Sequence, residues 1–337
     1  MNAIKALTVA IALTSIAACS VKSTNEVVKP AEQTSGPFGM VTHDAVNVEG
    51  GKAFAGVKKV VIGSFKIGFI TTKKEHAQAG GSGVGGNSTA MMELHGITPT
   101  VMQSITEKAY QDLLAQLQAA GYEVADRAQL TSSEFGKADS KASPFTEEAS
   151  FFGSDNTVTY VAPESIGKLF FFGGETAQRN GFGFNMPDVA ASGFADKNKL
   201  PVMSVMYNLD FSSNKSETGA FASFSAVEVG QALSVAPGSG ITLIGGQGGT
   251  FSTTNGSLRL GQPIASPDPF GEITNTSSDG MVVLETTVNV ASALLGGGTN
   301  QSRDFSITAD PAKYSSGAEN ILKKTNADLI RSMQTAK

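Results

Sequence analysis

Apolar side chains recur at helical spacing in two long stretches of the chain. In the first, Thr98 has the side chain of a helix N-cap, and Pro99 suits the first helical position, where its missing N–H leaves no hydrogen bond unmade. Gly121 is typical of the residue that follows a helix. The pattern predicts a helix over residues 99–120 with one apolar stripe, made of Val101, Ile105, Ala109, Leu113, Leu117 and Ala120.

The second stretch closes the chain. Asp310 is a good N-cap and Pro311 stands at the next position, so a helix is predicted to start there. One face of this C-terminal helix is expected to pack against a core through Tyr314, Ala318, Ile321, Thr325, Leu329 and Met333.

Two short apolar segments flank the first helix. Residues 59–65 (KVVIGSF) form a short apolar run rich in β-branched side chains that continues to Ile70, which is typical of a buried strand. Residues 122–127 are expected to form a second strand after Gly121. Strand, helix and strand with tight joints predict a βαβ unit with parallel strands and a right-handed crossover. The polar, glycine-rich residues 71–95 are expected to form a loop between strand and helix.

The rest of the chain predicts mostly strands. Residues 157–161 and 201–211 have strand character, residues 187–196 that of a short helix, and residues 136–148 that of a surface loop. Antiparallel hairpins are expected from the alternating segments 220–229, 241–244, 250–254, 257–260 and 281–290. The predicted fold class is α/β (α+β): a βαβ unit with a mixed sheet, added antiparallel hairpins and a C-terminal helix.

The first residues carry a secretory pattern. Lys5 precedes an apolar run over residues 6–18, which is shorter than the about 20 residues that a membrane-spanning helix needs. The run ends in Ile16-Ala17-Ala18-Cys19, and Cys19 is the only cysteine of the chain. This motif resembles the lipobox of bacterial lipoproteins, which implies cleavage before Cys19 and lipidation of its thiol. The alternative is an ordinary cleaved signal with a chance cysteine.

The resemblance to lipoproteins also implies a location. In these lipoproteins, an Asp directly after the lipidated cysteine retains the protein at the inner membrane. This chain has Ser20 at that position, so it is expected at the outer membrane, facing the periplasm. The domain prediction is a signal peptide over residues 1–18, a flexible lipidated tether over 19–36, and a periplasmic α/β domain over 37–337 with a hairpin-rich insertion around 212–280.

The composition limits the classes of partner and of site that the protein is expected to have. The net charge is −5, and removal of the signal takes away Lys5 and no acid, so the mature chain is one unit more negative. Without a basic excess, nucleic acid and anionic head groups are not expected partners. With Cys19 acylated, no thiol remains for a disulfide, a nucleophile or a metal site.

A further resemblance lies in residues 58–130. KKVVIGSF ends a strand in Phe65, Leu114 and Leu117 give the helix a Leu-x-x-Leu pattern, and GYEVADR is followed by Leu130. This order resembles the start of the curli-assembly lipoproteins, and residues 282–290 resemble their late strand. The resemblance implies an anticodon-binding-like α/β fold, shared by related periplasmic domains, and no site residue. The glycines at 80–86 and the Phe-rich middle depart from that pattern.

No motif predicts catalysis, a cofactor or a metal site. Residues 81–86 fit G-x-G-x-x-G, but polar residues precede them and no helix follows at once, so a loop is favoured over a nucleotide site. His43, His76 and His95 fall in predicted loops without metal-ligand spacing. Glu147, Glu148 and Asp155 are interpreted as surface charge rather than as a catalytic carboxylate pair.

The phenylalanines of the middle region allow two interpretations, a hydrophobic core or an exposed patch for a partner. They are Phe151, Phe152, Phe170, Phe171, Phe172, Phe182, Phe184 and Phe194.

Three functions stay open at this point. The first is a non-enzymatic, outer-membrane-anchored lipoprotein that acts in envelope assembly or secretion through contacts with other envelope proteins or with itself. The second is an oligomeric, pore-forming secretion lipoprotein. The third is a periplasmic ligand-binding protein or enzyme.

Overall fold

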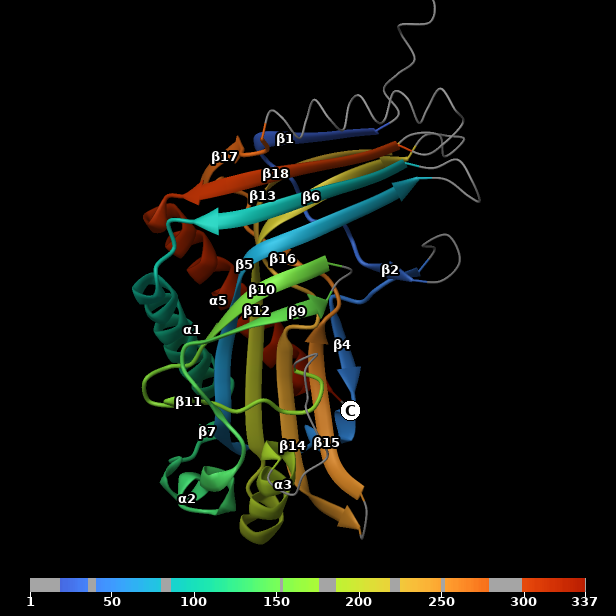
Figure 1. Cartoon of the computed structure of the whole chain (residues 1–337). Helices are drawn as coiled ribbons and strands as arrows, with labels where there is room; N and C mark the ends of the chain where they lie inside the picture. The colour runs from blue at the N-terminus through green and yellow to red at the C-terminus, as the bar shows by residue number, and fades with distance from the viewer. Residues whose placement is uncertain are drawn as a thin grey trace, which may run out of the picture.

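The computed structural model describes residues 19–35, 41–79, 86–151, 154–175, 186–218, 225–249, 252–278 and 299–336. It has the predicted mixed α/β content, with one large sheet and helices packed against it (Figure 1). The glycines at 80–85, the segment 281–290, and Phe152, Phe182 and Phe184 lie outside the described residues.

Most strands belong to one 14-stranded sheet. Its main path runs through β17 (Gly271–Asn275), β18 (Thr299–Ala309), β6 (Gly86–His95), β5 (Lys59–Ala79), β12 (Val202–Thr218), β14 (Gly240–Gly249), β15 (Ser252–Leu260) and β4 (Val46–Glu49). Off this path lie β1 (Cys19–Val27), β7 (Glu123–Val124), β9 (Phe145–Phe151), β10 (Ser154–Val161), β13 (Ser225–Val235) and β16 (Ile264–Ala265). Two-stranded sheets join β8 (Lys141–Ala142) to β11 (Lys168–Leu169) and β2 (Thr34–Ser35) to β3 (Val41–Thr42).

Strand β5 is the centre of this sheet. It pairs parallel with β12 and β7, and antiparallel with β6 and β10. Because β7 follows helix α1 (Pro99–Ala119) and lies parallel to β5, the predicted βαβ unit is confirmed. The unit also contains β6, which the sequence pattern did not predict.

A bulge at Gly63 sets which face each side chain of β5 occupies. Ile62 pairs with Met203 and Ser64 with Ser204, so β5 has one residue more than β12 at this point. After the extra residue, each side chain of β5 lies on the face opposite to the one that uninterrupted alternation would give it. Arg127 donates hydrogen bonds to the carbonyls of Ile62 and Gly63, at 2.7 and 3.1 Å.

The two faces carry two hydrophobic clusters. Helices α1 and α5 (Pro311–Thr335) lie side by side against one of them (Figure 1). The other cluster lies beneath α3 (Pro187–Asn198), α2 (Ala128–Thr131) and the 3-10 helix η3 (Glu134–Lys137). A second 3-10 helix, η2 (Gly51–Ala53), follows β4 and contacts β15. Of the phenylalanines considered above, Phe170, Phe172 and Phe194 are buried in the second cluster, which confirms the core interpretation for these three.

Both predicted long helices are confirmed together with their caps. The Thr98 side chain accepts a hydrogen bond from the Val101 N–H, and Asp310 accepts two, from the N–H groups of Ala312 and Lys313. In α1, Ile105, Ala109, Leu113 and Leu117 are buried as the stripe requires. In α5, all six residues of the predicted stripe are buried. Between the helices, Asn326 donates to the Asp112 carboxylate and accepts from the Tyr207 hydroxyl.

The strands of the second half are largely as predicted. β10, β12 and the helix α3 cover the expected residues, and β12–β13 and β14–β15 form antiparallel pairs. These pairs are continuous with β5 in the large sheet, and they include most of the expected hairpin-rich region 212–280.

Two predictions of loops are wrong for the residues named here. Residues 71–79 continue β5, and residues 86–95 form β6, paired with β5 from Thr72↔Glu93 to Ala79↔Gly86. Residues 145–148, expected in a surface loop, belong to β9. Both segments are polar, and cross-strand partners rather than intrinsic apolar character hold them in the sheet.

The expected flexible tether is also wrong for its first nine residues. Cys19–Val27 forms β1, which pairs parallel with β13 from Cys19↔Ser225 to Val27↔Gln231. Strand β13 would otherwise offer an unpaired edge of N–H and C=O groups, and β1 occupies it. The segment that follows Cys19 is therefore part of the domain.

Candidate functional site

The end of the sheet at which β1 begins gathers several strand ends. Cys19 pairs with Ser225, which also pairs with Thr218 at the end of β12. Among the strands β5, β6 and β18, Gly86 at the start of β6 pairs with Ala79 at the end of β5 and with Thr299 at the start of β18. Because β5 and β12 are parallel, the ends of β5 and β12 and the starts of β6, β13 and β18 lie on the same side as Cys19 (Figure 1). We call this the Cys19 end of the sheet.

One buried side chain fixes β1 to the rest of the domain. The amide nitrogen of Gln231 donates to the carbonyls of Asn25 and Gly271, at 2.7 and 3.1 Å. Its amide oxygen accepts from the N–H groups of Phe270 and Gly271, at 2.8 and 2.9 Å. The Asn25 side chain adds a bond from the Ile273 N–H. These contacts join the paired strands β1 and β13 to β17, which pairs with β18 and not directly with either of them.

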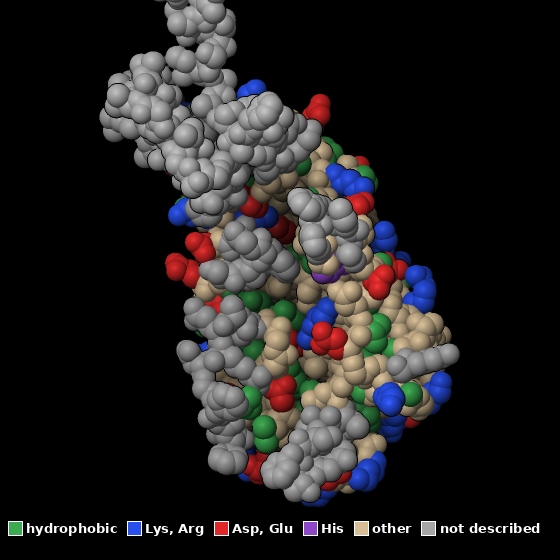
Figure 2. Space-filling model, turned by 90° about the vertical axis from the view of Figure 1, so that its right-hand side faces the viewer, with side chains coloured by type: hydrophobic (Ala, Val, Ile, Leu, Met, Phe, Trp, Pro, Cys, Tyr) green, Lys and Arg blue, Asp and Glu red, His purple; other side chains and the backbone are tan. Residues whose placement is uncertain are grey.

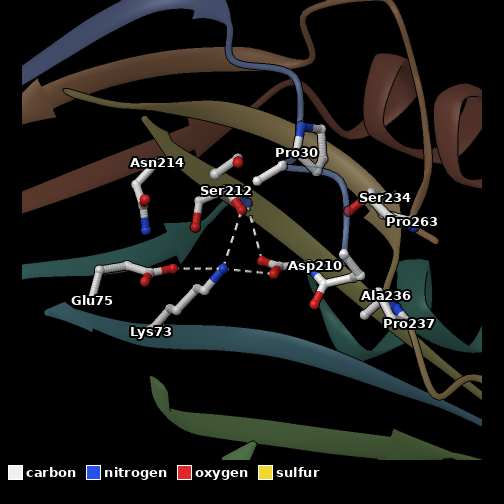
Figure 3. Close-up of a pocket in the computed structure, with 13 residues that line it drawn as sticks. Pro30, Lys73, Glu75, Asp210, Ser212, Asn214, Ser234, Ala236, Pro237 and Pro263 are labelled. Carbon is white, nitrogen blue, oxygen red and sulfur yellow. Dashed lines mark hydrogen bonds and ion pairs between the residues drawn. The ribbon is translucent and has the colours of Figure 1, made fainter. Parts of the chain in front are cut away.

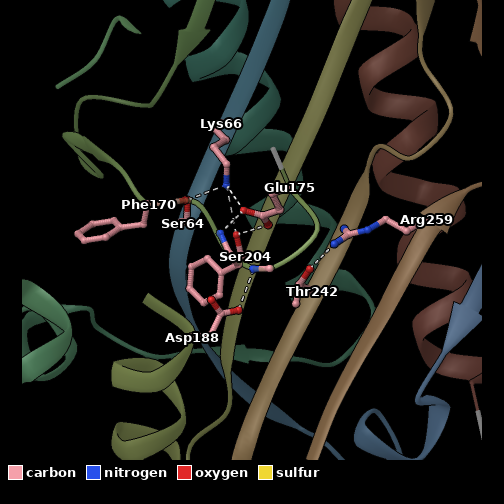
Figure 4. Close-up of polar contacts among 10 residues, drawn as sticks. Ser64, Lys66, Phe170, Glu175, Asp188, Ser204, Thr242 and Arg259 are labelled. Carbon is pink, nitrogen blue, oxygen red and sulfur yellow. Dashed lines mark hydrogen bonds and ion pairs between the residues drawn. The ribbon is translucent and has the colours of Figure 1, made fainter. Parts of the chain in front are cut away.

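A buried ion pair lies on the face of β5 opposite α1 and α5. Lys66 Nζ lies 2.6 Å from Glu175 Oε2, and neither side chain is exposed (Figure 4). Glu175 also accepts hydrogen bonds from the Ser204 hydroxyl and the Phe172 N–H, both at 2.7 Å. Lys66 donates to the Ser64 hydroxyl, and its Nζ lies 5.2 Å from the centre of the Phe171 ring.

These contacts keep Glu175 ionised. Burial by itself raises the pKa of Glu175, but the Lys66 charge, its hydrogen bond and the Phe172 N–H together bring that pKa below its ordinary value. Burial lowers the pKa of Lys66, and attraction to Glu175 offsets only part of that effect. The ion pair holds residues 172–175 against strand β5, so its role is structural.

A cavity of about 220 Å³ lies on the sheet near the N-terminal segment (Figure 3). Lys73 of β5 forms ion pairs there with Asp210 and Glu75, at 2.7 and 2.8 Å, and donates to the Ser212 carbonyl at 3.3 Å. Burial lowers the pKa of Lys73, but the two carboxylates outweigh it and raise that pKa above its ordinary value. The remaining lining residues are Pro30, Ala31, Gln33, Ser213, Asn214, Ser234, Ala236, Pro237 and Pro263.

The structure places two of the three histidines in strands. His76 lies in β5 and His95 ends β6, so the expectation that both are in loops is wrong. His95 is half exposed and its Nε2 lies 3.4 Å from Glu93. His43 lies between β3 and β4, as a loop residue, and its carbonyl accepts from Gln262.

The acidic candidates share a hairpin without forming a carboxylate pair across it. Glu147 and Glu148 are neighbours in β9, where successive side chains point to opposite faces. Their cross-strand partners in β10 are Val158 and Thr157, while Asp155 pairs with Ser150. Burial raises the pKa of Glu147.

The surface charge, the helices and the potential metal ligands add three findings. Basic and acidic side chains are interspersed on the face in Figure 2, without a continuous patch of one sign among the coloured residues. Within the described ranges, the helices include none with the length and apolar character of a membrane span. Across the same ranges, no group of three or more His, Cys, Asp and Glu side chains has a metal-binding arrangement.

Comparison with known proteins finds no match: no family model, no curated protein and no solved structure is similar to this chain.

Lys66, Lys73 and Asp210 were missed as residues of interest, although the sequence holds a signal for Lys66 and Asp210. Lys66 interrupts the apolar run from Val60 to Ile70, and Asp210 stands in the apolar segment 201–211. A charge inside a buried strand needs a partner. Glu175, the partner of Lys66, and Asp210, the partner of Lys73, are far from these lysines in the chain, so local patterns did not reveal the pairs.

Proposed function

We propose that this protein is a non-enzymatic, outer-membrane-anchored lipoprotein that acts in envelope assembly or secretion through protein contacts. The observation that supports it most is the position of Cys19 in the fold. The lipobox cysteine is the first residue of a strand hydrogen-bonded into the main sheet, at the end where several other strands end or begin.

A lipid on Cys19 would hold the domain in a defined orientation. Each buried CH₂ of an acyl chain contributes about 0.8 kcal/mol to membrane binding, so several chains together anchor a protein stably. Because β1 pairs with β13 from Cys19 onward, little free chain separates the lipid from the sheet. The Cys19 end of the sheet would then face the membrane, and α3, which lies near the other end of the long strands, would face away (Figure 1).

The test of this orientation uses the absence of any other cysteine in the chain. With the Cys19 thiol acylated, Thr218→Cys and Lys197→Cys each offer one thiol for a fluorescent label, at the Cys19 end and on α3. In liposomes that contain a head-group quencher, we expect strong quenching at position 218 and little at position 197. Equal quenching at both positions would contradict the orientation.

The partners are to be found by crosslinking in intact cells. A photoreactive residue at 218 or at 197, each in the wild-type and the Cys19→Ser background, separates contacts that depend on membrane anchoring from others. The proposal expects a defined envelope-protein adduct or self-adduct that is lost with Cys19→Ser. Adducts unchanged by loss of the anchor would count against it.

An oligomeric, pore-forming secretion lipoprotein is the second candidate. The observation that favours it is that two antiparallel pairs, β5–β6 and β12–β13, run out to the Cys19 end together with β18. Gel filtration of the lipidated protein in detergent distinguishes the candidates, because a ring elutes as a particle many times the mass of one chain. A monomer or a small oligomer supports the first candidate.

A further inference from the structure

The cavity beside Lys73 has a lining that selects for one sign of charge. The ammonium of Lys73 has three N–H donors, and Asp210, Glu75 and the Ser212 carbonyl accept from it. An anionic ligand would thus find the lysine donors already engaged. The two carboxylates and one ammonium leave an excess of one negative charge in the lining.

The same lining offers an acceptor to a donor group. Ser212 is 1% exposed, it lines the cavity, and its hydroxyl oxygen has no hydrogen-bond partner among the described residues. Leaving such a buried polar atom unpaired is unfavourable, so a ligand that pairs with it gains affinity. The Asp210 carboxylate lies beside it, because Asp210 Oδ1 accepts from the Ser212 N–H at 3.2 Å.

The remaining lining is mixed: Gln33, Ser213, Asn214 and Ser234 supply polar groups, and five small side chains supply apolar surface. They come from Ala31 and Ala236 and from the rings of Pro30, Pro237 and Pro263. A volume of about 220 Å³ holds a molecule the size of several waters, each of which takes about 30 Å³ in the liquid. This combination suits a short alkyl chain with an ammonium group at its end.

We infer that this cavity binds a small primary alkylammonium compound, whose ammonium group contacts Asp210 and the Ser212 hydroxyl and whose alkyl body lies against the prolines. The inference is independent of the proposed function, because it depends on the cavity and not on the lipid. A cation with directional N–H donors matches the lining better than a metal ion, because Lys73 already engages one oxygen of each carboxylate.

The N-terminal segment closes one side of the cavity. Pro30, Ala31 and Gln33 follow β1, and the Gln33 N–H and carbonyl form hydrogen bonds with the Gln262 side chain, at 2.8 and 2.9 Å. A bound ligand would contact this segment as well as the sheet. Ligand binding is therefore expected to protect residues 28–33 from hydrogen exchange.

Isothermal titration calorimetry of the whole mature domain tests the inference, with n-butylamine and 1,4-diaminobutane as probes and glutarate as the anionic control. We expect saturable binding of at least one amine, no binding of glutarate, and affinity reduced about tenfold or more in Asp210→Asn. Ser212→Ala keeps all charges and is expected to weaken binding by a similar factor. Glu123→Gln, far from the cavity, should bind like the wild type.

Three results would overturn the inference. One is the absence of saturable binding for both amines at millimolar concentration with the folded wild type, which would mean that the cavity holds only water. Another is equal binding of glutarate. The third is unchanged amine affinity in Ser212→Ala, a variant whose melting temperature also reports whether the fold is intact.

Discussion

Lys66 and Glu175, 109 residues apart in the chain, form an ion pair that is wholly shielded from solvent, with 2.6 Å between Nζ and Oε2. Ser64, Ser204 and the Phe172 N–H complete its hydrogen bonds. The pair joins the segment before residue 176 to the centre of the sheet. A buried pair of this kind is sensitive to the loss of one partner and far less sensitive to the loss of both.

Removing only the carboxylate should destabilise the protein strongly. Glu175→Ala leaves the Lys66 ammonium buried without its counter-charge, and we expect the free energy of unfolding to fall by about 3–5 kcal/mol. The double variant Lys66→Met/Glu175→Leu should recover most of that loss. Urea denaturation measures both, and Glu123→Ala, which breaks the exposed pair with Lys59, serves as the control with an expected change of at most about 1 kcal/mol. Equal losses in the single and double variants would show that the pair itself stabilises the fold.

The same pair predicts a dependence of stability on pH. The pKa of Glu175 is lower in the folded protein than in the unfolded chain, so its contribution is present above the unfolded value, about 4.3, and is lost as the pH falls through the folded value. Urea denaturation at several pH values from about 6 to about 3 measures this dependence. The free energy of unfolding should fall more steeply with decreasing pH for the wild type than for Lys66→Met/Glu175→Leu. The control Glu123→Gln should follow the wild type. Identical slopes for wild type and double variant would contradict the assignment.

The packing of α1 on the sheet is tested by its buried stripe. Leu113 is fully buried against the core, and Leu113→Ala should lower the free energy of unfolding by about 2–5 kcal/mol. The exposed Gln118 on the same helix gives the matched control, because Gln118→Ala should change it by no more than about 0.5 kcal/mol. Denaturant unfolding that shows similar small changes for both variants would mean that this stripe does not pack.

Gln231 is predicted to hold β1 in place. Gln231→Ala removes the side-chain bonds to Asn25, Phe270 and Gly271, so β1 should detach more often while the helices stay folded. Limited trypsin digestion after Lys22 should be several-fold faster than in the wild type, with helical circular dichroism unchanged. Gln129→Ala, at an exposed position of α2, should digest like the wild type. Unchanged cleavage after Lys22 would show that backbone pairing alone secures β1.

Local patterns were sufficient for the helices and for the apolar strands. Thr98 and Asp310 mark helix starts by their own side chains, and the apolar residues of β12 mark a buried strand without reference to any partner. The pairing of β5 with β7 then followed from the βαβ order.

Polar strands and buried charges could not be predicted in the same way. Residues 72–79 of β5 and the whole of β1 become strands because neighbouring strands offer backbone partners, which no local pattern records. The ion pairs Lys66–Glu175 and Lys73–Asp210 likewise join residues that are more than a hundred positions apart. The cavity beside Lys73 is lined by β5, β12, β13, the N-terminal segment and the connections at Ala236, Pro237 and Pro263, so it exists only in the fold.

The central claim is that Cys19 carries the lipid that anchors this protein. Mass spectrometry of the N-terminal peptide from membrane fractions, together with fractionation of Cys19→Ser, tests it most directly. The account predicts a wild-type chain that begins at acylated Cys19 and sediments with the outer membrane, and a Cys19→Ser protein that is unacylated and released from membranes. A wild-type chain with an unmodified Cys19 thiol, or a Cys19→Ser protein that still sediments with the outer membrane, would contradict the account.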